Sequence, residues 1–288
     1  MKIITKDFVK SNFPKRPAES SKGTFGRVLC VCGSTNMMGA ALLCARGIYA
    51  AGAGYVTMVV PEEEKDMVFS TLPEAVLLPL ENNQEITQIK NLTADQKQDV
   101  MVMGCGLGTD AAKYVPGLIS TLDLPLVLDG DGLNALAGLK EKFKFNMPAI
   151  LTPHPLEAAR LIDGEIPKDD AQREQMAKQI SAKYNAVCVL KGARTIVAYG
   201  GDTLVNETGS SALAKAGTGD VLAGLTAGIW AQLGKANVFD IKTAFNAAAC
   251  AVYLHGLAGD KAAADMSDYS VMASDLNKYI GISIKEIL

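Results

Sequence analysis

The chain has 288 residues, of which 49% are hydrophobic, so it is long and apolar enough to bury a substantial core. Its 28 Lys and Arg against 31 Asp and Glu give a net charge of -3, which offers no overall attraction to nucleic acid. Charges or Pro interrupt every apolar stretch of the N-terminus, and the longest apolar segments are shorter than the ~20 residues that span a bilayer. We therefore expect a soluble, cytoplasmic protein with neither nucleic-acid nor membrane partners.

From about residue 27 onward, short β-branched runs alternate with helix-like segments, which is typical of a sheet covered by helices on both faces. The expected strands are residues 27–32, 55–60, 75–78, 100–103, 125–128, 149–151, 186–190 and 195–199. Most are continuous apolar runs, which favours central parallel strands. The expected helices between them are residues 39–51, 111–121, 155–162 and 169–184. The pattern predicts an α/β fold with a mostly parallel sheet.

Two later segments, residues 221–233 and 244–257, are apolar around nearly their whole circumference. Such helices lie inside a domain or at an oligomer interface. No Pro-, Ser- or Gly-rich linker and no internal repeat divides the chain. We therefore expect a single domain over residues 1–288.

The cysteines lie in apolar contexts, without a C-x-x-C pair and without a His at metal-ligand spacing. They are Cys30, Cys32, Cys44, Cys105, Cys188 and Cys250. We interpret them as small core residues rather than as a disulfide framework or a structural zinc site.

Glycine-rich turns follow two of the expected strands, where open α/β sheets bind their ligands. The first runs from Gly33 to Gly39, and its amides either face a bound anion or ring or simply form a tight turn with positive φ. The second, with Gly104, Gly106 and Gly108, has G-x-G-x-G spacing and not the G-x-G-x-x-G of a dinucleotide fingerprint. Because no P-loop consensus occurs either, any phosphate must be held by another device.

The segment Gly217, Thr218, Gly219 leads directly into the apolar helix expected at residues 221–233. Two glycines keep side chains away from the amide-bearing end of that helix, so a phosphoryl group has room there and these three residues form a candidate anion hole. Asp220 follows in the first turn, where its carboxylate is placed to take a proton from a substrate hydroxyl. An N-cap role for Asp220 is the alternative.

A turn with two cations joins two expected strands, and it consists of Lys191, Gly192, Ala193, Arg194 and Thr195. A hairpin-like turn at the sheet end is suited to contacting a nucleotide phosphate or ribose, and a solvated hairpin tip is the competing interpretation.

His154 stands at a strand end between two prolines, so we expect it to face a ligand, whereas His255 lies within an apolar helix and is expected to be a satisfied core residue. Asp129, Asp131 and Asn134 follow another strand. Their hard oxygen atoms suit Mg²⁺ or a ribose, although an Asx turn with a helix cap explains them equally well.

Taken together and in this order, these segments resemble the ADP- or ATP-dependent NAD(P)H-hydrate dehydratases, a branch of the ribokinase-like superfamily. The matching blocks are residues 22–28, 33–41, 52–54, 104–108, 128–134, 151–155, 190–195, 216–224 and 253–260. Leu-Thr-Pro-His-Pro at 151–155 and Tyr-Leu-His-Gly-Leu-Ala-Gly-Asp at 253–260 narrow the resemblance to this branch. The chain departs from the family pattern at Cys105, usually Pro, at Gly130 and Gly132, usually Ala, and through the added cation of Lys215.

The resemblance implies a ribokinase-like fold. It also implies a repair reaction in which ADP or ATP is consumed and (S)-NADHX or (S)-NADPHX is converted back to NADH or NADPH. When ADP is the donor, the other products are AMP and phosphate. It implies Asp220 as the catalytic base, and Mg²⁺, without assigned ligands, as the cofactor. The implied hydrate pocket consists of Ala40, Gly106, His154 and Asp220, and the implied nucleotide site of Lys191, Gly192, Ala193, Arg194, Thr195 and Gly219. The resemblance further implies a homotetramer. It also implies the ADP-using type of the enzyme, which has no fused epimerase domain.

Two rivals stay open at this point. A small-molecule kinase of the same superfamily would use the same Asp220 and anion hole but release a stable phosphoester. A nucleotide sensor would bind NAD(P) or ADP without turnover.

Overall fold

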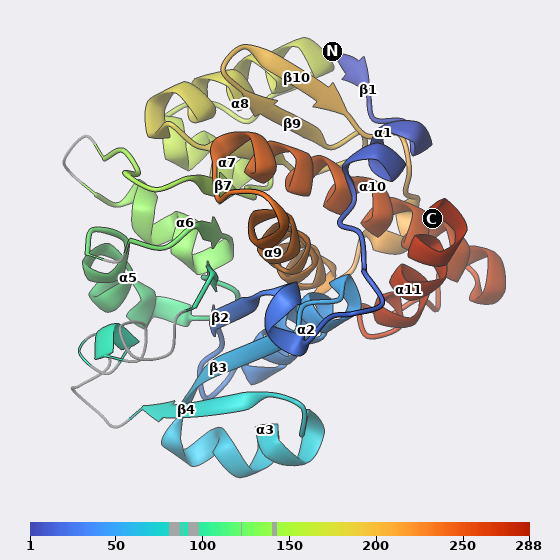
Figure 1. Cartoon of the computed structure of the whole chain (residues 1–288). Coiled ribbons are helices and arrows are strands. Elements are labelled where there is room, and N and C mark those ends of the chain that lie inside the picture. The colour runs from blue at the N-terminus through green and yellow to red at the C-terminus, as the bar shows by residue number, and fades with distance from the viewer. Residues whose placement is uncertain (81–86, 88, 92–97, 122, 140–142) are drawn as a thin grey trace.

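The protein is described by a computed structural model that covers all residues except 81–86, 88, 92–97, 122 and 140–142. Within the described residues, ten strands form one sheet in the order β1-β10-β9-β8-β7-β6-β5-β2-β3-β4 (Figure 1). The strands are β1 (Lys2–Ile3), β2 (Arg27–Val31), β3 (Tyr55–Pro61), β4 (Val76–Leu80), β5 (Val100–Met103), β6 (Leu126–Leu128), β7 (Ala149–Leu151), β8 (Val187–Leu190), β9 (Ile196–Tyr199) and β10 (Asp202–Val205).

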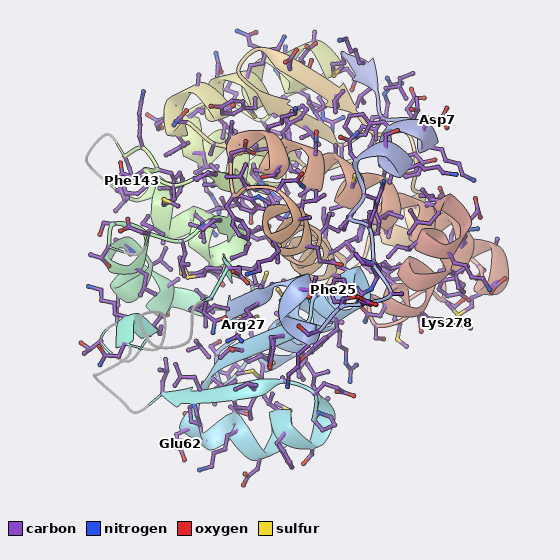
Figure 2. The ribbon with its side chains drawn as sticks, viewed as in Figure 1. Asp7, Phe25, Arg27, Glu62, Phe143 and Lys278 are labelled. Atoms are coloured by element: carbon purple, nitrogen blue, oxygen red, sulfur yellow. The ribbon has the colours of Figure 1, made fainter. Side chains whose placement is uncertain are left out.

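The described α-helices are α1 (Lys6–Asn12), α2 (Met38–Ala51), α3 (Lys65–Thr71), α5 (Ala111–Ile119), α6 (Gly130–Ala137), α7 (Pro155–Ile162), α8 (Asp170–Tyr184), α9 (Thr218–Ala236), α10 (Ile241–Met266) and α11 (Leu276–Ile287). Charged side chains such as Asp7, Glu62 and Lys278 are exposed at the periphery of the molecule (Figure 2). None of the described helices is both long enough and apolar enough to cross a lipid bilayer.

The centre of the sheet is parallel from β4 to β8. The predicted parallel, doubly covered sheet is therefore confirmed. Towards one edge, β9 runs antiparallel to both β8 and β10, so residues 191–195 form the predicted hairpin turn. Because parallel strands end at the same edge, the loops after β2, β5, β6, β7 and β8 meet along one side of the sheet.

Alternate residues of each central strand face two separate hydrophobic cores. Along β2, Val28 and Cys30 join the core beneath α2, α9, α10 and α11, whereas Leu29 and Val31 join the core beneath α5 to α8. This alternation explains why the central strands read as continuous apolar runs.

Helix α9 packs on the sheet between helices α2 and α10, near the centre of Figure 1. Residues from Val221 to Gly234 are all buried. The apolar circumference of this helix is thus satisfied inside the chain, so it is no evidence for an oligomer interface. Nearly all of α10 between Ala244 and Gly259 is buried in the same way.

Close contact between α2 and α9 depends on glycine. A Cβ atom on Gly224 would lie 1.9 Å from the carbonyl oxygen of Cys44, and one on Gly47 would lie 2.6 Å from that of Val221. A Cβ on Gly228 would come 2.7 Å from the Ile48 carbonyl oxygen. The two backbones therefore touch directly, and this contact fixes where the N-terminus of α9 meets the sheet.

The sequence-predicted elements are present, with ends displaced by a few residues, and the largest difference is the longer α10. Sequence analysis missed β1, β10, α1, α3, α6 and α11. β1 and β10 are too short to carry a clear alternation, and β1 forms only because it pairs with β10.

We predict that Gly224→Ala destabilises the protein by about 1–3 kcal/mol, because the methyl group forces α2 and α9 apart. Gly281→Ala is the matched control, since Gly281 also lies within a helix but a Cβ atom there would have no neighbour within 4 Å. The control is expected to be neutral or stabilising by up to about 1 kcal/mol. Denaturant unfolding measures both changes, and equal effects would contradict the packing argument.

Candidate active site

A buried carboxylate, Asp129, follows β6 at the edge where the strand ends meet, and it is 3% exposed. Its Oδ1 accepts a hydrogen bond from Thr152 Oγ1 at 2.7 Å and lies 2.5 Å from Lys191 Nζ. Thr152 follows β7 and Lys191 follows β8, so three successive strands deliver these groups. The cation compensates a carboxylate that would otherwise be costly to bury.

Lys191 also reaches a second buried acid. Its Nζ lies 3.9 Å from Glu157 Oε2, and burial raises the pKa of Glu157 to about 7. The same Nζ lies 3.5 Å from the position that a Cβ on Gly219 would take. Lys191 is therefore held between the acids of the sheet edge and the start of α9.

The N-terminus of α9 is open. Gly217 is its N-cap and has the left-handed φ of 90°, and no side chain of the described residues caps the first amides. Thr218 turns its hydroxyl away to the carbonyl oxygens of Leu213 and Lys215. The Thr218 amide donates to the Lys215 carbonyl oxygen at 3.4 Å, and the other amides of this helix end form, together with the helix dipole, a site that favours an anion.

Asp220 lies in the first turn of α9, three residues past the N-cap, so the N-cap alternative is wrong. Its carboxylate lies within 4.8 Å of a carboxylate oxygen of Asp129 and of the Cys105 Sγ. Burial, followed by the charge of Asp129, raises the pKa of Asp220 to about 6. A carboxylate with this pKa is deprotonated at neutral pH and is a stronger base than an ordinary aspartate.

A cavity of about 560 Å³ extends from the N-terminus of α9. All the residues predicted for the nucleotide site line it, namely Lys191, Gly192, Ala193, Arg194, Thr195 and Gly219. Arg194 adopts a left-handed φ of 59° and pairs with Asp170 and Glu207. The turn is therefore a cavity wall and not only a solvated tip.

The opposite wall was not predicted as part of a site. It comprises residues 206–211, Leu213, Ala214, Leu222, Val252, His255 and Gly256. His255 is buried, its Nε2 lies 2.9 Å from the Thr218 carbonyl oxygen, and burial lowers its pKa to about 4. The core interpretation of His255 is confirmed, yet the same residue lines the cavity in its neutral form. The role of His255 in the cavity wall follows from its contact with Thr218 in the folded chain. The spacing of residues in the sequence does not predict that contact.

The residues predicted for the hydrate pocket fall into two places. A Cβ on Gly106 would lie 2.7 Å from the Ala40 Cβ, so these two residues are in contact, and Gly106 follows the Cys105 that neighbours Asp220. Gly33 donates its amide to the Cys105 carbonyl oxygen at 2.7 Å, which ties the two glycine turns together. Gly33 has a φ of 84°, in keeping with the tight-turn interpretation.

His154 is the N-cap of α7. Its Nδ1 accepts hydrogen bonds from the amides of Leu156 and Glu157, and its Nε2 lies 3.3 Å from Glu157 Oε1. The ring has a structural role, although its side chain remains 47% exposed at the rim of the same sheet edge. Burial and then the charge of Lys191 lower the pKa of His154.

Three further residues that the sequence singled out, Asp131, Asn134 and Lys215, have different partners. Asp131 Oδ2 accepts the Gly108 amide at 2.7 Å, while Asn134 Oδ1 accepts a hydrogen bond from Arg160 and so turns to the surface. Lys215 donates to the Tyr269 carbonyl oxygen, so its cation is engaged by the loop before α11.

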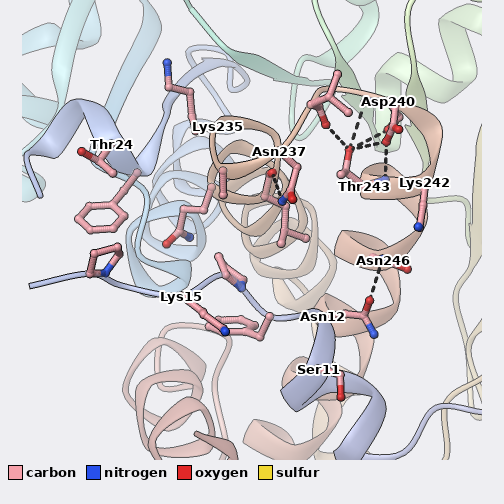
Figure 3. Close-up of a pocket in the computed structure, with 18 residues that line it drawn as sticks. Ser11, Asn12, Lys15, Thr24, Lys235, Asn237, Asp240, Lys242, Thr243 and Asn246 are labelled. Atoms are coloured by element: carbon pink, nitrogen blue, oxygen red, sulfur yellow. Dashed lines mark hydrogen bonds between the residues drawn. The ribbon is translucent and has the colours of Figure 1, made fainter.

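A second cavity, of about 670 Å³, lies at the other end of α9 (Figure 3). Lys15, Lys235 and Lys242 line it together with Asp240 and Asn246. Although larger, it contains none of the residues predicted for a site, and Asp240 is used as the N-cap of α10. The cavity beside Asp220 is therefore the candidate active site.

Comparison with known proteins agrees with this geometry. Residues 28–281 match the family model described as NAD(P)H-hydrate dehydratase. A bifunctional NAD(P)H-hydrate repair enzyme of Moorella thermoacetica is 35% identical over 298 aligned positions, which cover 99% of this chain and 54% of that protein. The chain thus spans about half the length of the bifunctional relatives that it matches.

Two solved structures are similar over the whole chain. The ADP/ATP-dependent NAD(P)H-hydrate dehydratase from Bacillus subtilis, co-crystallized with ATP/Mg²⁺, is 31% identical with a TM-score of 0.85, covering 100% of this chain and 99% of that one. A ribokinase-like superfamily protein from Enterococcus faecalis is 27% identical with a TM-score of 0.83, covering 100% and 96%. With its family match and its α/β fold of the ribokinase-like type, this chain belongs to the NAD(P)H-hydrate dehydratase family.

Proposed function

We propose that the chain repairs hydrated nicotinamide cofactor. ADP, or ATP, donates its terminal phosphoryl group to the hydroxyl of (S)-NADHX or (S)-NADPHX, and elimination of phosphate regenerates NADH or NADPH. With ADP the other product is AMP, and the hydroxyl oxygen leaves within the phosphate. The observation that carries this proposal is the carboxylate of Asp220, with its pKa raised to about 6, in the first turn of an uncapped helix whose Gly219 lines a cavity of about 560 Å³.

In this reaction Asp220 removes the proton of the substrate hydroxyl. Its raised pKa makes it a better acceptor, and the substrate ring is placed at Ala40 and Gly106, which contact each other. The nitrogen of the hydrated ring, a tetrahydropyridine, then expels phosphate, which is a far better leaving group than hydroxide. Loss of a proton from the neighbouring ring carbon to solvent restores the double bond of the dihydropyridine.

The nucleotide occupies the cavity between the turn at 191–195 and the wall around His255. The amides of Gly217, Thr218 and Gly219 face the migrating phosphoryl group, where they are pre-arranged to stabilise its charge. Lys191, on the boundary between cavity and acids, adds a positive charge at the same point.

A Mg²⁺ ion fits the chemistry of this edge. Lys191 and Thr152 both contact Asp129 Oδ1, close to a positive charge that disfavours a second cation, whereas Asp131 accepts the Gly108 amide with Oδ2 and offers Oδ1 as a hard oxygen donor. Asp131 would therefore hold the ion together with the nucleotide phosphates, and the ion would neutralise phosphate charge.

Product analysis separates this function from a kinase on the same scaffold. Incubation with hydrated NADH and ADP, or ATP, is expected to release inorganic phosphate and restore NADH absorbance in equal amounts. A persistent phosphorylated alcohol would instead identify a kinase, and nucleotide binding without any product would identify a sensor.

We predict that Asp220→Asn lowers the dehydration rate by ~10²–10⁴ while nucleotide still binds, because the amide cannot accept the proton. The variant is expected to be no less stable than the parent at pH 7. The folded-state pKa lies above the ordinary value of 3.8, so the charged form of Asp220 lowers stability once the pH rises through about 6. Near-parental turnover, with ADP binding verified calorimetrically, would contradict the assignment.

The pH dependence of kcat/KM provides an independent check. Activity is expected to fall below a midpoint near pH 6, because protonation of Asp220 removes the base. Glu157→Gln serves as control, since Glu157 is the other nearby acid with a raised pKa, of about 7. The inflection should persist in that variant, and its disappearance would assign the titration to Glu157 instead.

We also propose that the chain forms a homotetramer in the cytoplasm. Support comes from large apolar side chains that remain uncovered, such as Phe69, 62% exposed, and Tyr269, 94% exposed. Light scattering is expected to give four times the mass of one chain, and the mass of a monomer would refute the assembly.

A further inference from the structure

Four of the cysteines that sequence analysis assigned to the core converge on one point. The Sγ atoms of Cys30, Cys32 and Cys44 all lie within 4.8 Å of one another. The thiol of Cys105 interacts with those of Cys32 and Cys44. These four residues, called the thiol cluster below, are at most 2% exposed.

The cluster results from tertiary structure. Cys30 and Cys32 are two residues apart along the line of β2 and so point to the same face of the sheet. Cys44 comes down from α2, and Cys105 comes from the turn after β5. Because Gly224 has no side chain, the backbone of α9 packs directly against that of Cys44 in α2. This contact holds α2 close to the strand.

We propose that the thiol cluster binds one thiophilic divalent cation of the Zn²⁺ class, with Cys30, Cys32 and Cys44 as ligands and Cys105 as the fourth donor. Zinc takes four thiolates in a tetrahedron with bonds of about 2.3 Å, which places the sulfur atoms about 3.8 Å apart. Sulfur atoms already within 4.8 Å need only a small contraction to reach that geometry.

The positions of the sulfur atoms favour a cation over an inert apolar core, because three thiols within 4.8 Å of one another present soft donors to a single point. A thiol that coordinates the ion releases its proton to solvent, so no oxidant or reductant is needed.

The cluster adjoins the candidate active site. Cys105 Sγ lies 3.7 Å from Asp129 Oδ2 and close to Asp220, whose side chain is only partly buried. An ion in the cluster would therefore sit next to the proposed catalytic base.

The test uses Cd²⁺, which forms the same thiolate bonds as zinc and has a strong ultraviolet thiolate-to-metal charge-transfer band. The full chain, reduced and kept free of oxygen, is titrated with Cd²⁺ in the absence of nucleotide and hydrated cofactor. We expect the band to saturate at one ion per chain, with the same stoichiometry by native mass spectrometry. Because no turnover is measured, the result is independent of the proposed repair reaction.

Cys32→Ala is expected to weaken Cd²⁺ binding at least tenfold and to reduce the band. The matched control is Cys188→Ala, which also removes a fully buried cysteine at a sheet strand but lies outside the cluster. Circular dichroism verifies that both variants fold, and Cys44→Ala replaces Cys32→Ala should that variant fail. Absence of a band in the parent chain, or equal loss in the control, would overturn the proposal.

Discussion

The direct backbone contact between α2 and α9 is the constraint on which the candidate site depends. Gly47, Gly224 and Gly228 remove the side chains that would separate these helices. As a result the first turn of α9 points at the edge where the parallel strands end. The amide end of the helix therefore lies next to a row of polar residues at the strand ends. Each of these two features is common by itself in α/β proteins.

Electrostatics at this place follow from burial. Asp129 and Asp220 lie close together with little water around them, and Lys191 compensates mainly Asp129, to which it is bonded. The uncompensated member, Asp220, keeps a raised pKa and is the one placed at the helix end. Asp129 and Asp220 are the same residue type, so the difference between them comes from their partners.

Local sequence was sufficient to predict the strands β2 to β9 and the open start of α9. Continuous apolar runs form strands, and the Gly-Thr-Gly-Asp segment begins a helix, because of residues that are close together in the sequence. The Lys191 to Asp129 contact joins residues 62 positions apart, and the thiol cluster joins two strand residues, a helix and a turn. Such contacts depend on how the layers stack, so neither spacing nor composition reveals them. His154 caps the next helix, a role that its position at a strand end did not distinguish from facing a ligand.

The central claim is that the amide end of α9 holds a phosphoryl group beside Asp220. A crystal structure of the chain with a non-hydrolysable nucleotide tests it most directly. The account predicts the terminal phosphate on the amides of Gly217 to Gly219, with the nucleoside against the turn at 191–195. A nucleotide found instead in the lysine-lined cavity of Figure 3 would contradict the account.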